Sequence, residues 1–436
     1  MKSIPRPLWS VLCVLPLVAG AADLPPPTAA QREQVITWRR DFHQHPELGN
    51  SEVRTAQQIV AALNAMGLKP QTGLAKTGVI ARIEGKAPRP LLALRADMDA
   101  LPVTEDTGLP FASTATTTYR GEQVGVMHAC GHDAHLAILL GVAQRLVEHR
   151  AQLPGSVLLV FQPAEEGPPD GETGGAERML AEGLFDGENK PDAMLGLHVW
   201  SAMNVGQIGL RSGPIMAGSD RFRIQVQGVQ THGSRPWGGI DPILASARIV
   251  EGLQSLVARR LDLTLAPAVV SVGAIKGGIR YNIIPDQVEM VGTIRTFDLG
   301  MRAQLHRDFA TVVEHTAAAH GATAKTTIER HTPVNANDPA LTTRLRPALE
   351  AVAGAGQLVE MSLTTGAEDF AFFAERVPSM YFFVGATPAG IEAKTAPSNH
   401  SPKFLLDEGA LDVGVRALEA AALRYFSALD AVADRE

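Results

Sequence analysis

The sequence predicts an α/β protein with a largely parallel sheet, interrupted by an inserted domain of β-α-β-β-α-β order. Before residue 212, buried strands alternate with helices, which is typical of a parallel sheet with both faces covered. From about residue 213 to 333 the pattern changes to a complete ferredoxin-like unit. The α/β pattern then resumes, so we expect the main domain to be built from residues 23–212 and 334–436.

Buried runs in the first part end in side chains that can bind metals or move protons. They are residues 90–103 with Asp97 and Asp99, residues 155–167 with Glu165 and Glu166, and residues 192–200 with His198 at the end. Apolar residues at helical spacing predict a helix that begins just after His132. Ligands of such sheets gather beyond the carboxyl ends of the strands, so we expect these polar side chains on one rim.

The inserted unit and the remainder of the main domain are predicted element by element. The insert comprises strand 220–228, helix 241–260, strands 268–278 and 286–297, helix 300–321 and strand 322–331. A helix over 339–354, a strand over 379–387 and a final helix over 407–433 complete the main domain.

The first 22 residues have the pattern of a secretory signal peptide. Lys2 and Arg6 precede an apolar run of about a dozen residues and small residues that suggest cleavage near Ala21 or Ala22. A membrane-spanning helix needs about twenty apolar residues. Lipid attachment at Cys13 is disfavoured because Leu12 stands where a small residue is wanted. We therefore expect a periplasmic or secreted protein with no membrane partner after cleavage.

The composition of the chain argues against nucleic acid as a partner and leaves one cysteine to be explained. The net charge of -7 gives no basic surface for nucleic acid, and 45% hydrophobic residues suffice for a large core. The chain has two cysteines, and one of them lies in the segment that we expect to be removed. Cys130 would then have no internal disulfide partner. It is either a buried inert thiol or a ligand.

Five residues of metal-ligand type are expected on the same rim of the sheet: Cys130, His132, Glu166, His198 and His400. Thiolate, imidazole and carboxylate are ligands of zinc, and five of them suffice for two ions if one bridges. Two ions about 3.5–4 Å apart form a known hydrolytic arrangement. Taken singly, the signals are weaker, because His400 could be an ordinary surface histidine and "PAEEGPPDGE" a solvated acidic turn.

Adjacent glutamates can divide two roles. Glu166 could bind a metal while Glu165 stays free as a general base, because neighbouring residues at the end of a strand point in different directions. Asp99 is expected to hydrogen-bond a ligating histidine and fix its tautomer, although it could equally cap a helix.

Eight motifs occur in the order seen in the metal-dependent aminoacylase and carboxypeptidase superfamily. They are "RADMDALPV", "HACGHDAH", "PAEEG", "LHVW", "THGSRP", "YNIIPD", "GAEDFAFF" and "NHSPKF". From about Gln31 to the C-terminus, the chain resembles most closely the amidohydrolase branch, which includes hippurate hydrolases, N-acyl-amino-acid amidohydrolases and auxin-conjugate hydrolases.

The resemblance implies a di-metal peptidase-type catalytic domain in which the five ligands hold two divalent ions and Cys130 is the bridge. It implies that Glu165 is the general base and that the insert forms a homodimer, in which His232 stabilises the oxyanion in the partner's site. It also implies that Asn282 contacts substrate. Many relatives carry a histidine where this chain has Trp237, so the resemblance does not define the substrate preference near that loop.

These expectations define an exported hydrolase that cleaves the amide bond of N-acyl amino acids with a metal-activated water. Zinc is favoured by the ligand types, and manganese, cobalt and nickel are alternatives. A dipeptidase or carboxypeptidase acting on short peptides is the alternative enzyme. A periplasmic binding protein that holds metal without turnover is the alternative from another class, although a binder has no need of the free carboxylate of Glu165.

Overall fold

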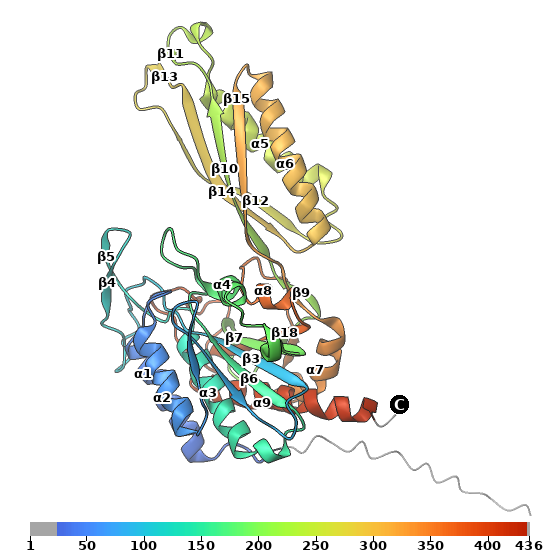
Figure 1. Cartoon of the computed structure of the whole chain (residues 1–436). Coiled ribbons are helices and arrows are strands. Elements are labelled where there is room, and N and C mark those ends of the chain that lie inside the picture. Colours follow the sequence, from blue (N-terminus) through green and yellow to red (C-terminus); the bar gives the residue numbers. More distant parts are fainter. Residues whose placement is uncertain (1–23, 434–436) are drawn as a thin grey trace, which may run out of the picture.

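The computed structural model describes residues 24–433, which form a broad main domain and an elongated inserted domain stacked on it (Figure 1). The segment predicted as a signal peptide, residues 1–22, lies outside the described residues. Within residues 24–433, no helix combines the length and the apolar character that crossing a membrane requires.

An eight-stranded sheet forms the centre of the main domain. Its order is β1 (Gln71–Leu74), β2 (Gly78–Ile83), β6 (Ser156–Gln162), β3 (Leu91–Asp97), β7 (Ala193–Asn204), β18 (Ser379–Thr387), β8 (Ile208–Leu210) and β17 (Leu358–Glu360). The four central strands from β6 to β18 are mutually parallel, and antiparallel pairs occur toward the edges. The predicted α/β class with a largely parallel sheet is confirmed.

Helices cover both faces of this sheet. One face packs against α1 (Ala29–Gln44), α2 (Val53–Ala65), α3 (His132–Glu148), α7 (Pro339–Ala353) and α9 (Gly409–Ala433), and the other against α4 (Gly175–Ala181) and α8 (Ala371–Ala374). Each face of the sheet has its own hydrophobic core, and alternate residues of β3 belong to different cores because strand side chains point to opposite faces. Leu92 and Leu94 lie in the core under α1, α2, α3, α7 and α9, and Leu91 and Ala93 lie in the core under α4 and α8.

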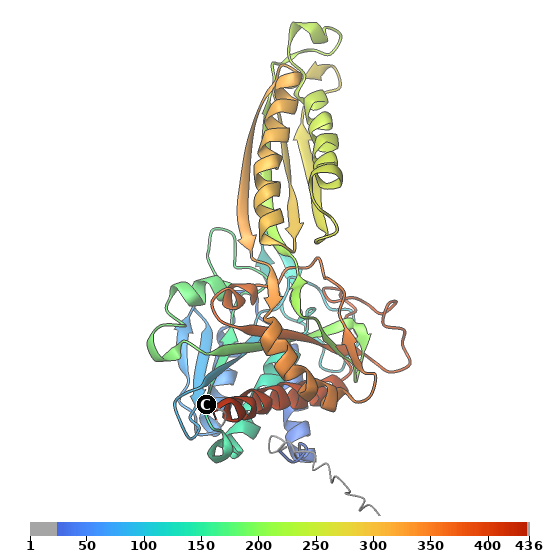
Figure 2. The same ribbon diagram turned by 90° about the vertical axis from the view of Figure 1, so that its right-hand side faces the viewer.

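The inserted domain has the predicted β-α-β-β-α-β order. Its elements are β10 (Gly218–Gln227), α5 (Pro242–Arg260), β12 (Ala268–Gly277), β14 (Gln287–Thr296), α6 (Leu299–Ala319) and β15 (Thr323–Thr332). The antiparallel sheet has the order β12-β14-β10-β15, and both helices pack on one face (Figure 2). Phe222, Ile224 and Val226 of β10 point into that core. Asp241 and Asp298 cap the two helices by accepting main-chain N–H bonds.

Short two-stranded ribbons complete the fold. The ribbon β9 (Gly213–Met216) with β16 (Asn335–Asn337) joins the chain where it leaves the main domain and returns to it. The pair β11 (Thr231–His232) and β13 (Ile283–Ile284) lies at the far end of the insert, away from the main domain (Figure 1). The hairpin β4 (Thr116–Tyr119) and β5 (Glu122–Gly125) projects from the main domain.

Three predicted strands end elsewhere: β3 ends at Asp97 and β6 at Gln162, before Asp99 and the two glutamates, and β7 continues past residue 200. We expected His198 at the end of a strand over 192–200, but β7 continues to Asn204. Its parallel pairing with β18 extends past His198 and also joins Thr387 to Asn204, which keeps the last residues of β7 in the sheet.

Candidate metal centre and active site

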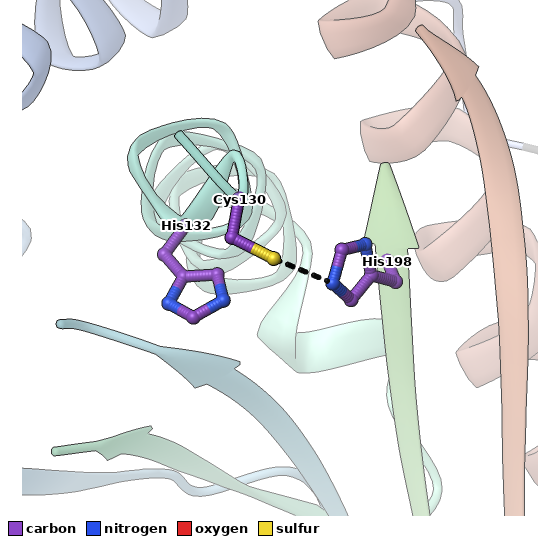
Figure 3. Close-up of side chains that lie close together, drawn as sticks. All are labelled: Cys130, His132 and His198. Atoms are coloured by element: carbon purple, nitrogen blue, oxygen red, sulfur yellow. Dashed lines mark hydrogen bonds between the residues drawn. The ribbon is translucent and has the colours of Figure 1, made fainter. Parts of the chain in front are cut away.

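The structure brings the five predicted ligand residues together at one rim of the sheet. Cys130 and His132 lie at the start of α3, Glu166 follows β6, His198 lies in β7, and His400 lies in the loop before α9. Cys130 Sγ is 3.3 Å from His198 Nε2, and in the view of Figure 3 the side chain of Cys130 lies between the rings of His132 and His198. The same sulfur is 3.3 Å from His400 Nε2.

Cys130 belongs to two groups of potential ligands. The first contains Cys130, His132 and His198, the second contains Cys130, Glu166 and His400, and the ligand atoms in each group lie within 4.8 Å of one another. Ligand atoms around one tetrahedral zinc ion are about 3.2–3.8 Å apart, given the usual zinc–ligand distances. Small side-chain movements would therefore close each group around an ion, with the sulfur shared.

Hydrogen bonds orient two of the imidazoles with Nε2 toward the cluster. His132 Nδ1 lies 2.8 Å from the main-chain oxygen of Asp99, and His198 Nδ1 lies 2.7 Å from that of Val199, so in both rings Nδ1 donates. His132 Nε2 is buried and has no hydrogen-bond partner among the described residues. An unpartnered buried nitrogen beside a thiol and carboxylates fits a cation.

Asp99 acts differently from the prediction in one respect. Its main-chain oxygen, and not its carboxylate, is the closer partner of His132, because the carboxylate Oδ1 is 3.4 Å from Nδ1. The carboxylate instead accepts the main-chain N–H groups of Glu165 and Glu166, each at 3.0 Å. Asp99 thus fixes the turn that carries both glutamates and, through its carbonyl, the ring of His132.

Backbone geometry explains why the ligands can meet. Gly131 has φ +95°, and a Cβ there would lie 2.3 Å from Val199 Cγ2, so a glycine is needed between Cys130 and His132. His400 has φ 71°, and its N–H donates to the oxygen of Ala129. Such strained conformations in non-glycine residues are common at functional sites.

Asn399 attaches the loop of His400 to the rest of the site. Its Nδ2 donates to the main-chain oxygens of Cys130 and Val199, and its Oδ1 accepts the N–H of Ser201. This role of Asn399 could not be predicted, because asparagine is common in loops.

Burial shifts the pKa values of Cys130 and His198 in the cluster. Burial raises the pKa of the Cys130 thiol well above its usual value, and the carboxylates of Glu166 and Glu165 raise it further. Burial also lowers the pKa of His198, which stays neutral. A bound cation would deprotonate the thiol, since the charge of an ion dominates such a site.

The two adjacent glutamates have different surroundings. Glu166 Oε1 is 2.9 Å from His400 Nε2, whereas Glu165 Oε1 accepts the N–H of Asp369 at 3.3 Å. Burial raises the pKa of Glu165 well above its usual value, with further contributions from Glu368 and Glu166. Glu165 forms one potential ligand group with His132 and Glu166, but it also forms a second group, with Glu368 and Asp369, to which Glu166 does not belong.

A buried network behind Glu165 was missed by the sequence analysis. Arg95 is fully buried in β3, and its guanidinium contacts Asp97 at 2.7 Å, Glu368 at 2.9 Å and Asp369 at 3.0 Å. Tyr381 donates to the carboxylate of Glu368 at 2.7 Å. The positive charge of Arg95 thus compensates the negative charges of the carboxylates that lie near Glu165. The available signal was an arginine in an otherwise apolar strand, which needs buried acidic partners.

Of the three histidines in "HACGHDAH", His132 is the one that shares a potential ligand group with Cys130. His135 Nδ1 donates to Asp97 Oδ1 at 2.6 Å, and its Nε2 accepts the N–H of Val199 at 2.9 Å, so both nitrogens are occupied. His128 is fully buried, and burial lowers its pKa to about 3. It belongs to none of the potential ligand groups among the described residues.

His232 and Asn282 lie apart from this cluster. His232 is exposed in β11 at the far end of the insert, and the carbonyl of Asn282 accepts the N–H of Gly233 in the adjoining segment. Ser234 N–H donates to His232 Nδ1 at 3.0 Å, a contact within the local turn. Because Nδ1 accepts this bond, Nε2 is the nitrogen that can donate.

The α/β sheet, the inserted domain and the rim of thiol, imidazole and carboxylate groups are typical of a hydrolase with a dinuclear metal site. The model of peptidase family M20/M25/M40 matches residues 93–424. The chain belongs to this family and is a hydrolase of amide or peptide bonds.

Similar proteins cover almost the whole chain. N-acetylcysteine deacetylase of Bacillus subtilis is 40% identical over 385 residues, which are 87% of this chain and 93% of that protein. Thermostable carboxypeptidase 2 of Saccharolobus solfataricus is 37% identical over 393 residues, or 90% and 95% of the two chains. The crystal structure of the Bacillus subtilis YXEP protein, described as a dinuclear metal binding peptidase, has a TM-score of 0.76 at 36% identity and covers 92% of this chain and 99% of that one.

Proposed function

We propose that this chain is an exported amidohydrolase with two metal ions, which removes the acyl group from N-acyl amino acids. The observation that carries the proposal is a thiol shared by two ligand groups, next to a glutamate with separate contacts. The similarity to an N-acetylcysteine deacetylase supports an acylated amino acid as substrate. Export rests on the signal-peptide pattern of residues 1–22.

Cys130, His132 and His198 would hold one ion, and Cys130, Glu166 and His400 the other. When bound, divalent ions polarise a carbonyl and lower the pKa of water toward 7. Thiolate and imidazole favour zinc, with manganese, cobalt or nickel as alternatives.

Glu165 is the general base in this proposal. Its carboxylate takes a proton from the attacking water and gives it to the leaving amine. The N–H of Asp369 holds one oxygen of this carboxylate, and the Arg95 network fixes the loop that supplies that N–H. Glu165 can therefore move a proton while its position stays fixed.

We also propose that the protein acts as a homodimer through the insert. Exposed large apolar side chains are concentrated there, among them Ile275, Ile279 and Tyr281. The edge strand β12 has one side unpaired in the described residues, and an exposed edge can pair with another chain. In such a dimer, Nε2–H of His232 would reach the partner's site as an oxyanion donor, and Asn282 beside it would contact the substrate.

A substrate comparison tests the proposed reaction. The metal-loaded protein is assayed for release of free methionine from N-acetylmethionine, N-benzoylmethionine and alanylmethionine. We expect kcat/KM for at least one acylated substrate to exceed that for the dipeptide by about tenfold or more. A dipeptidase or carboxypeptidase would reverse this order, and a metal-binding protein without turnover would hydrolyse none of the three.

A further inference from the structure

Glu52 is a fully buried residue whose carboxyl group contacts residues 164–166, which we call the glutamate turn. Its Oε1 accepts the main-chain N–H of Ala164 at 2.8 Å, and its Oε2 accepts the hydroxyl of Thr77 at 2.7 Å. Burial, together with the negative charge of Asp99, raises the pKa of Glu52 to about 7. A carboxyl oxygen accepts an N–H in either protonation state, so the contact to Ala164 does not require a charged Glu52.

Helix α2 does not need the side chain of Glu52. The residue stands at the N-terminal end of α2, but its side chain makes no capping hydrogen bond there. Glu47 caps the helix instead, because its carboxylate accepts the N–H groups of Arg54 at 3.1 Å and Thr55 at 2.8 Å. A buried carboxyl group is costly unless it is hydrogen-bonded. The bonds that satisfy Glu52 lead to the glutamate turn and to Thr77, and not to the helix.

Ala164 has a backbone conformation that alanine rarely adopts. Its φ is 52°, in the left-handed region, which is unfavourable for a residue with a Cβ. Inside the turn, the carbonyl of Ala164 accepts the N–H of Gly167 at 3.3 Å, which is long for such a bond. Conformations of this kind persist only where the surrounding structure holds them. The shorter bond from the Ala164 N–H to Glu52 opposes relaxation of the turn.

Glu52 and Asp99 together bind three consecutive N–H groups of the glutamate turn. Asp99 accepts the second and third at 3.0 Å each, and Glu52 accepts the first, that of Ala164. The segments that carry the two acceptors are themselves joined, because Leu48 and Ala100 form a parallel bridge. The turn is therefore held by two side chains from one paired unit, and the contact of Glu52 is the one that bears on the left-handed residue.

We propose that Glu52 is a positioning residue, which holds the N–H of Ala164 and thereby fixes the direction of Glu165 relative to Glu166. This inference rests on the proposed amidohydrolase function and adds a residue to its site. Without the bond, Ala164 would relax toward a negative φ and rotate the peptide that leads into Glu165. A displacement of about 1 Å at a catalytic group can lower a rate about a hundredfold.

Two substitutions of Glu52 test the contact with Ala164. Glu52→Met has a similar length but lacks a strong acceptor, so kcat for N-acetylmethionine at saturating zinc should fall by at least about tenfold, with KM within about threefold. Glu52→Gln keeps an oxygen for Ala164, and its amide can donate to Thr77, so kcat should stay within about threefold of the wild type. If Glu52→Met fails to fold, Glu52→Asp replaces it, because its side chain is one methylene shorter.

Glu419→Met is the matched control for lost stability. Glu419 is a buried glutamate of α9 that pairs with Arg145 at 2.7 Å and belongs to none of the potential ligand groups among the described residues. Its replacement should lower the melting temperature and leave kcat unchanged. Equal losses of kcat in Glu52→Met and Glu419→Met would overturn the proposal.

Ala164→Gly provides a rescue that general stabilisation would not give. Glycine adopts a positive φ without steric cost, so the turn should depend less on Glu52 in this background. We expect Glu52→Met to lower kcat at least about threefold less in Ala164→Gly than in the wild type. Losses that simply add would contradict the role of Glu52 in holding Ala164.

Hydrogen exchange gives a readout that does not depend on turnover. Amides of the glutamate turn should exchange at least about tenfold faster in metal-loaded Glu52→Met than in the wild type, and Glu419→Met should leave them unchanged. If the wild type hydrolyses no N-acyl amino acid, the proposed function fails, and the catalytic part of this inference fails with it. If the wild type is active but Glu52→Met retains its kcat and its exchange rates in the turn, the function stands and Glu52 is not a positioning residue.

Discussion

Replacing Glu165 by glutamine is expected to lower kcat by about 10²–10⁴, the usual contribution of general acid-base catalysis, while the protein keeps its metal ions. Glutamine has the same shape and keeps an oxygen for the N–H of Asp369, but it cannot accept the proton of the attacking water. Metal content by mass spectrometry and turnover of N-acetylmethionine are measured on the same preparation.

Glu166→Gln is the matched control one residue away. Glu166 belongs to the ligand group with Cys130 and His400, so this change should reduce bound metal as well as turnover. Full turnover in Glu165→Gln would assign the base to another residue. Loss of metal from Glu165→Gln alone would exchange the roles of the two glutamates.

His232→Ala is expected to reduce kcat by about 10²–10³, the loss seen when one oxyanion donor is removed. Within one chain His232 lies at the end of the insert away from the main domain, so this loss would arise in the partner's site (Figure 1). Ser234→Ala is a useful companion change. It removes the hydroxyl contact to His232 Nδ1 but keeps the main-chain one, so it should have a smaller effect.

Mixing two inactive variants shows whether His232 acts in the active site of its own subunit or in that of the partner. A mixed dimer of Glu165→Gln and His232→Ala subunits contains one site with both Glu165 and the partner's His232. Half of the dimers are mixed at equal concentrations, and one of their two sites is complete, so activity should recover to about a quarter of the wild-type value. Subunit exchange is verified separately, for example with labelled subunits. If exchange occurs and activity does not recover, His232 acts in its own chain or has no role in catalysis.

Much of the fold could be predicted because its signals are local. Alternating strands and helices define the parallel sheet, and the order of elements between residues 213 and 333 identifies the ferredoxin-like insert. The ligand residues could be proposed because thiol, imidazole and carboxylate groups occur in loops next to the strands or, for His198, within β7. The structure brings all five together.

The supporting contacts could not be predicted, because they join residues far apart in the chain. Arg95 meets Glu368 and Asp369 only after β3 and the loop before α8 are brought together. Asn399 reaches the carbonyl of Cys130 across 269 positions of the sequence. The role of Asp99 was only partly predicted, because its main-chain oxygen, which carries no sequence signal, is what holds His132.

The most direct test of the shared-thiol site is a titration of the chelator-treated protein with zinc, followed by both bound metal and hydrolysis of N-acetylmethionine. Cys130 stands in both ligand groups, so activity should reach its plateau near two equivalents per chain. Cys130→Ala should weaken the binding of both ions and abolish most turnover. Full activity at one equivalent, or a Cys130→Ala protein that retains two ions and wild-type turnover, would contradict a site built around this thiol.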